Sequence, residues 1–277
     1  MAIARRDHYI AQFYLRNFAE PMFSDHIRVY TRRHRKWEER RTRGVGWFPH
    51  LYSMFNMRGE RTDAFERFLK EQVEDPVAPA LKQAAEAPDK LTDKGRQAIA
   101  LFIGVTYART PTAIKRAEDG SFEDMPREQL ADLDEWVKLW CSVTGREFGA
   151  NSRSEFTKPS VFSSILRFAA SLQERLLRWN WTFVRTTPER PFVTSDCPAF
   201  AQHDGKRDIQ FVSFPISSSV ALVVNSAGQI RQDMEPLVQV RAMNGQTLDR
   251  AREFVVCRQP CFLGDDFLVE WAQRTPE

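Results

Sequence analysis

The hydrophobic pattern of this 277-residue chain changes near Asn180. Between residues 62 and 179, apolar side chains recur every three or four positions, which predicts helices. After that point the chain has short runs rich in Val, Phe and Thr, which favour strands. We expect these strands at 181–186, 191–195, 209–214 and 220–224. A helical part followed by consecutive strands predicts an α+β fold, with a mostly antiparallel sheet packed on helices.

Threonines and prolines set the expected helix boundaries. Thr62 and Thr92 each precede an apolar helical stripe and are expected N-caps. Pro76 and Pro79 are expected to bend or break the first of these helices before Leu81. We expect further helices from Pro126, from Pro159, over 242–253 and at the C-terminal end, with a strand at 254–256.

The N-terminal segment 8–18 is rich in large apolar side chains. Read at helical period, Tyr9 and Phe13 share one side, while His8 and Gln12 lie four apart on a neighbouring stripe. We therefore expect this segment to pack into the fold and to carry two polar groups inward.

Residues 27–31 and 37–40 have the pattern of a hairpin around a basic turn. Residues 1–61 hold 13 Lys and Arg against 6 Asp and Glu, whereas the rest of the chain holds 27 against 31. Clustered guanidinium groups with aromatic side chains between them suit phosphate contact and base stacking. The competing interpretation is a solvated turn whose charge blocks edge-to-edge strand pairing. The candidate nucleic-acid-binding residues are Arg32, Arg33, Arg35, Lys36, Trp37 and Arg40.

A chain of this length with 42% hydrophobic residues can bury a sizeable core. We expect one compact domain over 1–277, with an N-terminal helix and basic hairpin (1–61), a helical part (62–179) and a sheet-rich part (180–277). The hairpin is expected to join the later sheet.

The sequence has no run of eighteen apolar residues, and its start lacks the apolar core of a signal peptide. We therefore expect a cytoplasmic protein with no membrane partner. Its cysteines have neither zinc-site spacing nor the pattern of a disulfide framework, so we expect reduced thiols. They are Cys141, Cys197, Cys257 and Cys261.

Five motifs follow one another in order along the chain. They are the run 8–18, Leu51-Tyr52-Ser53, Glu66 and Glu74, Arg109 before Pro111, and the segment 191–198. In these segments the chain resembles an uncharacterised bacterial family, domain of unknown function 4238. Ala11 stands where that family favours proline, and Cys197 where it usually has a small polar residue. The family has no established activity, so the resemblance implies which polar residues to test but names no reaction.

Asp196 follows a predicted strand at a proline-containing turn, where a rigid scaffold commonly presents polar side chains. It is a candidate general base or metal ligand. The competing interpretation is an Asx-turn, in which the carboxylate accepts backbone amides to close the bend. Ser195 lacks the Gly-x-Ser-x-Gly context of a nucleophile elbow.

Four further residues carry candidate chemistry. His8 has a side chain suited to acid–base work or metal binding, or it is a hydrogen-bonded packing residue. Glu66 and Glu74 lie about two helical turns apart, so both carboxylates can share a face; solvated helix charge is the alternative. Arg109 follows an apolar helix, so its charge needs a bound anion or an internal partner, for which Glu66, Glu74 and Asp196 are the candidates.

The sharper hypothesis joins His8, Glu66, Glu74, Arg109 and Asp196 as a catalytic set in one pocket between helices and sheet. It predicts a hydrolase of phosphodiester or nucleotide substrates, such as a metal-dependent nuclease, in which a divalent metal and Arg109 stabilise developing negative charge. The alternative is a non-catalytic nucleic-acid- or protein-binding module with a structural buried polar network. A hydrolase of other substrates is a third hypothesis, and convergence on a reachable cavity favours an enzyme.

Overall fold

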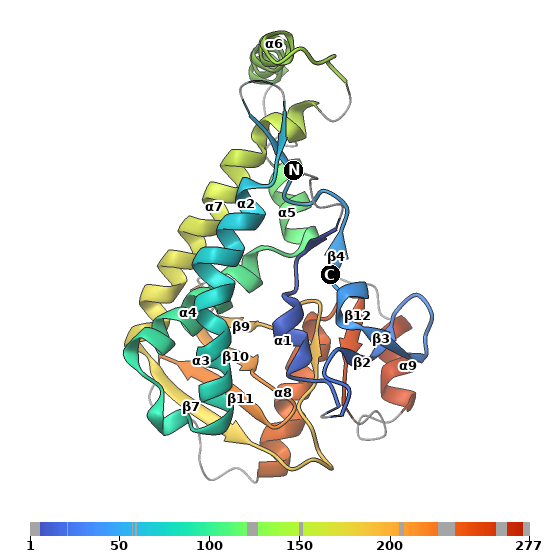
Figure 1. Ribbon diagram of the computed structural model, residues 1–277, viewed down its shortest axis with the longest axis vertical. Coiled ribbons are helices and arrows are strands. Elements are labelled where there is room, and N and C mark those ends of the chain that lie inside the picture. The colour runs from blue at the N-terminus through green and yellow to red at the C-terminus, as the bar shows by residue number, and fades with distance from the viewer. Residues whose placement is uncertain are drawn as a thin grey trace.

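The computed structural model describes residues 6–20, 22–56, 58, 60–120, 127–149, 152–204, 208–226, 236–258 and 265–273. Helices form one side of the molecule and antiparallel sheets lie against them (Figure 1). The α+β prediction is confirmed. The largest of three buried apolar clusters in the described residues draws on the N-terminal segment, the helices and the C-terminal strands, with members from Tyr9 to Val256.

The helical side is built around two long helices, α4 (Asp93–Ala108) and α7 (Ser152–Arg178). They cross closely at Gly104, where an added Cβ would lie 2.8 Å from the Cα of Ala169. Thr92 caps α4 as expected, because its Oγ1 accepts a hydrogen bond from Gly95 N at 3.1 Å. The other helices on this side are α2 (Ala64–Leu69), α3 (Asp75–Glu86), α5 (Pro111–Gly120) and α6 (Arg127–Val143).

Of the expected bend or break at Pro76 and Pro79, the break is wrong, because the helix runs on from α2 through the π-helical turn η2 (Lys70–Glu74) into α3. In that turn the Asp75 N–H reaches back to the Lys70 carbonyl. Pro76 directly follows this turn, inside the continuous helix. Pro159 lies inside α7, which begins at Ser152. Pro126 lies outside the described residues.

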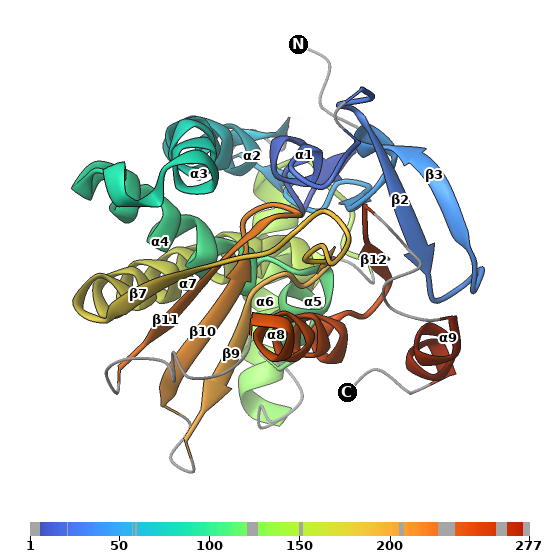
Figure 2. The ribbon, with the colours of Figure 1, turned by 90° about the horizontal axis from the view of Figure 1, so that it is seen from below.

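The first sheet has the order β7-β11-β10-β9, and all its neighbours are antiparallel. Its strands are β7 (Asn180–Arg185), β9 (Phe200–His203), β10 (Ile209–Pro215) and β11 (Val220–Asn225). Helix α8 (Pro236–Arg250) lies beside this sheet (Figure 2). β11 is buried along its whole length, which agrees with the unbroken apolar run over 220–224.

The second sheet combines strands from the N-terminal and C-terminal parts of the chain, in the order β3-β2-β12-β8. β2 (His26–Thr31) and β3 (Trp37–Arg41) form the expected hairpin, and β2 also pairs with β12 (Phe254–Val256). β12 pairs in turn with the short β8 (Thr194–Ser195). The hairpin therefore does join a later sheet. The remaining elements are η1 (Thr42–Gly44), β5 (Met54–Phe55), β6 (Arg61–Thr62), η3 (Pro88–Lys90) and α9 (Asp265–Gln273).

The N-terminal segment is less helical than its pattern predicts. β1 (Asp7–His8) pairs with β4 (Trp47–Phe48), and only Gln12–Arg16 form the short helix α1. The Gly46 carbonyl accepts hydrogen bonds from the backbone of Tyr9 and Ile10, at 2.9 and 3.3 Å, which holds the chain extended before α1. The expected packing into the core is confirmed for Tyr14, Leu15 and Phe18, which are fully buried. Phe13 is only partly buried.

No helix in the described ranges is both long enough and apolar enough to span a bilayer. Cys141 and Cys197 are buried free thiols, and Cys257 is also buried. Cys261 lies outside the described residues.

Candidate functional site

Four of the five predicted catalytic residues line one cavity of about 940 Å³. They are His8, Glu66, Glu74 and Arg109. The cavity lies between β1 and α1 on one side and the continuous helix α2–η2–α3 on the other, and we call it the helix cavity. Its volume is in the range of small-molecule sites, about 300–1,000 Å³. The residues were chosen by type, and their convergence comes from tertiary packing.

Arg109 is the most deeply buried charged residue of this cavity, with no exposed surface. It follows the apolar helix α4, and its Nη1 donates to Glu74 Oε1 at 2.8 Å. Burial alone would lower the pKa of Arg109, but the adjacent Glu74 carboxylate raises it above the usual value. Within the described part of the chain, its Nε and Nη2 have no hydrogen-bond partner, and neither has the buried hydroxyl of Tyr52. The Glu74 pair therefore uses only one of the three guanidinium nitrogens.

Glu66 belongs to a pair of neighbouring carboxyl groups. Its partner, Asp7, is buried, and Asp7 Oδ2 accepts a hydrogen bond from the Tyr52 amide at 2.7 Å. Burial raises the pKa of Glu66 to about 7, and the charge of Asp7 and a hydrogen bond to it act in the same direction. Glu66 therefore keeps its proton close to neutral pH. Sequence reasoning missed Asp7, although it directly precedes the run that begins at His8.

His8 is partly buried in β1, and its Nε2 lies 3.3 Å from the carbonyl oxygen of Arg43. Burial lowers the pKa of His8, and the Arg43 carbonyl and the Glu74 charge oppose that effect. The imidazole is therefore mainly neutral at pH 7. If Nε2 donates to the carbonyl, Nδ1 is left as a proton acceptor.

Across the ranges that the structure describes, no three His, Cys, Asp or Glu side chains converge as a set that could hold a metal ion. The described carboxylates and histidines therefore do not form a complete set of ligands in the helix cavity.

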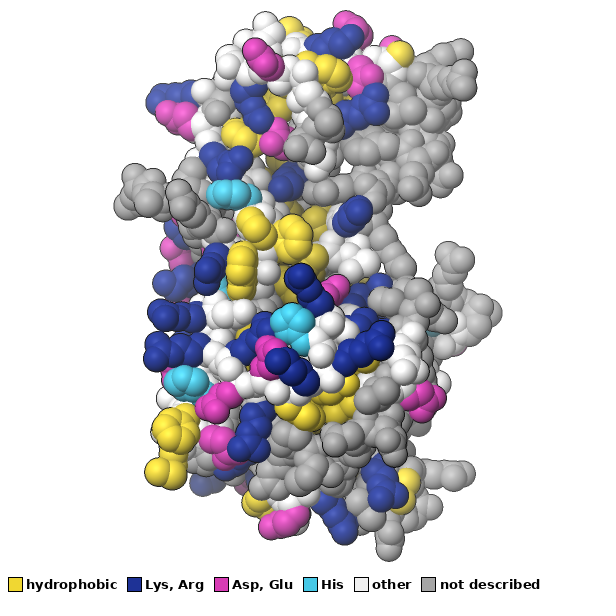
Figure 3. Space-filling model, turned by 90° about the vertical axis from the view of Figure 1, so that its right-hand side faces the viewer, with side chains coloured by type: hydrophobic (Ala, Val, Ile, Leu, Met, Phe, Trp, Pro, Cys, Tyr) yellow, Lys and Arg dark blue, Asp and Glu magenta, His cyan; other side chains and the backbone are white. Residues whose placement is uncertain are grey.

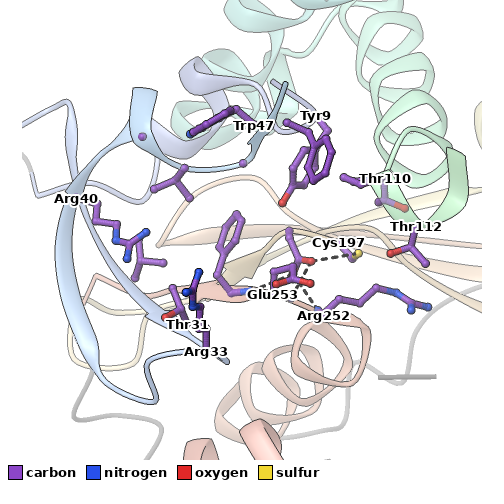
Figure 4. A pocket seen from close by; sticks show the side chains of 18 of the residues that line it. Tyr9, Thr31, Arg33, Arg40, Trp47, Thr110, Thr112, Cys197, Arg252 and Glu253 are labelled. Carbon is purple, nitrogen blue, oxygen red and sulfur yellow. Dashed lines mark hydrogen bonds between the residues drawn. The ribbon is translucent and has the colours of Figure 1, made fainter. Parts of the chain in front are cut away.

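Asp196, the fifth predicted residue, lines a different cavity of about 470 Å³, which also contains Thr31, Arg33 and Arg40 of the hairpin (Figure 4). We call it the hairpin cavity. The single five-residue pocket is therefore not what the structure shows. The reason lies in the second sheet: β8 pairs with β12, which carries Asp196 to the start of β12.

The Asp196 carboxylate is occupied by backbone amides. Oδ1 accepts from Arg252 N at 3.0 Å and from Phe254 N at 3.5 Å, and Oδ2 accepts from Glu253 N at 3.0 Å. Burial raises the pKa of Asp196 to about 6, although these amides act to lower it. The carboxylate accepts backbone amides, as the Asx-turn interpretation expected, but the donors come from a segment more than fifty residues away. Ser195 is fully buried.

A thin wall separates the two cavities. His8 and Arg109 line the helix cavity, whereas the next residue in each case, Tyr9 and Thr110, lines the hairpin cavity. At β1 this follows from the alternation of side chains along an extended segment.

The six candidate nucleic-acid-binding residues divide into three groups of two. Arg32 is engaged in the fold, because its Nε donates to the Arg252 carbonyl at 2.7 Å and its guanidinium lies 4.4 Å from the centre of the Trp271 ring. Trp37 packs edge-on against Tyr30.

The carboxylate of Glu38 neutralises two more of the six, Arg40 at 2.9 Å and Lys36 at 3.4 Å. Arg33 and Arg35 are exposed and have no ion pair within the described ranges. On the face that carries the hairpin, basic side chains are interspersed with acidic ones (Figure 3).

No curated protein and no solved structure matches this chain. Residues 6–260 match the family described as Protein of unknown function (DUF4238). The matched span includes both cavities as well as the hairpin, and the chain belongs to this family.

Proposed function

We propose that this protein is a hydrolase of phosphate esters, with phosphodiester or nucleotide substrates, and that the reaction takes place in the helix cavity. The observation that carries the proposal is Arg109, a fully buried guanidinium at the cavity wall with only one of its three nitrogens paired. A neutral imidazole and a protonated carboxyl line the same cavity.

The unpaired nitrogens support an anion as the missing partner. Leaving a buried donor unsatisfied costs about 1–3 kcal/mol, and more when the group is charged. A guanidinium edge presents two parallel N–H groups, which match two oxygens of a phosphate. Tyr52 adds an unpaired hydroxyl that lines the same cavity. Glu74 would then act as a positioning residue that fixes the guanidinium.

The acid–base groups fit hydrolysis of a P–O bond. In the proposed step a water molecule attacks phosphorus, and neutral His8 accepts a proton from that water. Glu66, which holds a proton near neutral pH, donates it to the leaving oxygen as the P–O bond breaks. Arg109 stabilises the charge on the remaining phosphoryl oxygens. The proton then passes from His8 back to Glu66 through solvent, which restores both groups.

A divalent metal in this scheme would need ligands from the substrate, because the chain's own side chains do not form a ligand set in the described ranges. Mg²⁺ commonly binds in this way, through one or two carboxylates together with substrate phosphates.

The test is an activity screen against RNA, DNA, nucleotides and p-nitrophenyl phosphate esters, with and without Mg²⁺, Mn²⁺ or Zn²⁺. Glu66→Gln and His8→Asn should each reduce kcat by about 10²–10⁴. Arg109→Lys keeps the positive charge but not the two parallel N–H donors of the guanidinium, and should lose most of the activity. Glu71→Gln is the matched control, since Glu71 is an exposed carboxylate of the same cavity. Activity that Glu66→Gln and His8→Asn leave intact would refute the proposal.

A second candidate function is nucleic-acid binding by the hairpin. The observation that favours it is that Arg33 and Arg35 project into solvent without ion pairs in the described part of the chain. This candidate does not depend on the helix cavity, and a salt titration tests it. We also propose a cytoplasmic location, supported by the buried free thiols Cys141 and Cys197.

A further inference from the structure

A third cavity, of about 380 Å³, lies between the start of α5 and the side of α7. We call it the α5 cavity. It meets the hairpin cavity along a shared edge formed by Thr110, Thr112, Cys197 and Arg252. The two cavities therefore form one continuous groove, on the far side of the wall from the helix cavity.

The α5 cavity is positively charged. Its lining residues include Arg250 and Arg252 but no carboxylate. Neither arginine has an ion-pair partner in the described ranges, and the buried Nε of Arg250 has no hydrogen-bond partner there either. Arg252 extends toward the side where Thr112 and Cys197 lie (Figure 4). The beginning of α5 adds hydroxyl groups and the positive end of a helix dipole.

The same cavity offers a flat apolar surface. Tyr107 and Phe168 stack with their ring centres 5.7 Å apart and their planes at 21°. The Arg250 guanidinium lies 5.1 Å from the centre of the Tyr107 ring. Stacked aromatic rings beside a guanidinium are typical of surfaces that bind a nucleobase.

The hairpin cavity contributes a free donor to the groove. Tyr9 is only 6% exposed, and its hydroxyl has no hydrogen-bond partner in the described part of the chain. Figure 4 shows this hydroxyl pointing into the cavity. The carboxylates of Asp196 and Glu253 lie at the hairpin end, so an anionic group is better placed at the α5 end.

We propose that this groove is a mononucleotide-binding site, separate from the helix cavity. The phosphate binds between Arg250, Arg252 and the start of α5, and the base lies against Tyr107 and Phe168. A mononucleotide fits better than a nucleic-acid strand, because the two arginines and the stacked rings line a single cavity of limited volume.

The test is isothermal titration of the full chain with AMP, adenosine, inorganic phosphate and a 5′-phosphorylated oligothymidylate. AMP should bind at least tenfold more tightly than adenosine or phosphate, because only AMP engages both the arginines and the rings. Arg250→Gln combined with Arg252→Gln should weaken AMP binding at least tenfold. Arg35→Gln combined with Lys36→Gln is the control, and should leave AMP binding unchanged.

Tyr9→Phe removes only the unpaired hydroxyl, so this variant should fold normally and bind AMP a few-fold more weakly. The titrations are repeated in Glu66→Gln protein, where hydrolysis in the helix cavity cannot consume AMP. Activity that survives in Glu66→Gln protein while AMP still binds would thus count against the proposed hydrolase alone. AMP binding no tighter than adenosine binding would overturn the nucleotide site. The nucleotide site would also be overturned if the oligothymidylate bound more tightly than AMP and this binding depended on Arg35 and Lys36.

Discussion

Arg109 Nη1 donates to Glu74 Oε1 at 2.8 Å, and this bond connects the end of α4 to the end of the π-helical turn η2. The two partners differ in burial, because Arg109 has no exposed surface whereas the Glu74 side chain retains 22%. Losing one partner therefore has unequal consequences. A stranded Arg109 stays buried, but a stranded Glu74 can recruit water.

Glu74→Met should accordingly cost more stability than Arg109→Met. We expect about 3–5 kcal/mol for Glu74→Met, which leaves an uncompensated buried charge, and about 2–3 kcal/mol for Arg109→Met. The double variant should lose less than the sum of the two single losses, by at least about 1 kcal/mol. Urea unfolding of the four proteins measures this cycle. Additive losses would show that the pair is not coupled.

Asp196→Asn should destabilise the protein by about 1–3 kcal/mol, because the amide offers one acceptor oxygen to three backbone N–H groups. Activity in the helix cavity should persist in whatever fraction stays folded, since Asp196 lines the other cavity. Asp63→Asn, at a partly exposed carboxylate, is the control and should change stability by less than about 0.5 kcal/mol. Full stability with complete loss of activity would return Asp196 to the catalytic set.

Glu66 should make the folded protein less stable as the pH rises. The folded protein holds this proton to about pH 7, whereas the unfolded chain releases it near a pKa of about 4.3. Between those values the unfolded state is ionised and the folded state is not, so stability falls with rising pH and the loss is complete above the folded pKa.

Glu66→Gln removes this dependence. Relative to wild type, the variant should gain about 1 kcal/mol between about pH 4.5 and pH 8, a modest value because the side chain is only partly buried. Unfolding curves at both pH values give the difference. An equal stability gap at the two pH values would mean that Glu66 titrates normally.

Replacing Arg33, Arg35 and Lys36 together by Ser tests the hairpin as a nucleic-acid surface. For every phosphate that the variant no longer neutralises, the log–log salt slope of duplex DNA binding should fall by up to about 0.9. The triple variant should stay as stable as wild type, since two of these side chains have no ion pair in the described ranges. Arg32→Ser, by contrast, should destabilise the fold, because it breaks the bond to the Arg252 carbonyl. A salt slope unchanged in the triple variant would mean that these side chains are merely solvated and do not contact phosphate.

Two neighbouring aromatic residues of the N-terminal segment should respond differently to truncation. Phe18 is completely buried, so Phe18→Ala should cost about 3–5 kcal/mol. Phe13 is partly buried against Phe102, with ring centres 5.7 Å apart, so Phe13→Ala should cost about half as much. Thermal and urea unfolding of both variants measure the two losses. Equal losses would place Phe13 as deep in the core as Phe18.

The sequence pattern alone predicted those elements that are stabilised mainly by local contacts or that are fully buried. The cap at Thr92, the hairpin and the apolar strand β11 follow from residue type and spacing. β9 was not predicted, because it is a four-residue strand whose last two residues, Gln202 and His203, are exposed. The extended backbone at Asp7–His8 was also missed, since it depends on pairing with Trp47–Phe48, which lies far along the chain.

The candidate site was likewise only partly predictable from the sequence. Residue type and the family resemblance selected His8, Glu66, Glu74 and Arg109, and the packing of α1 and α2–η2–α3 brings them together. Asp196 was grouped with them because sequence does not reveal that β8 pairs with β12. Asp7 was overlooked because a single acidic residue before a strand carries no spacing signal, and only burial beside Glu66 gives it significance.

The wall between the helix cavity and the groove has a thermodynamic consequence. His8 and Tyr9 share a peptide unit, and so do Arg109 and Thr110, so a shift of either backbone segment alters both compartments at once. If a nucleotide in the groove changes the affinity of the helix cavity for its substrate, linkage requires the substrate to change nucleotide affinity by the same factor. Two ligands that are not in contact would then change each other's affinity through two peptide bonds.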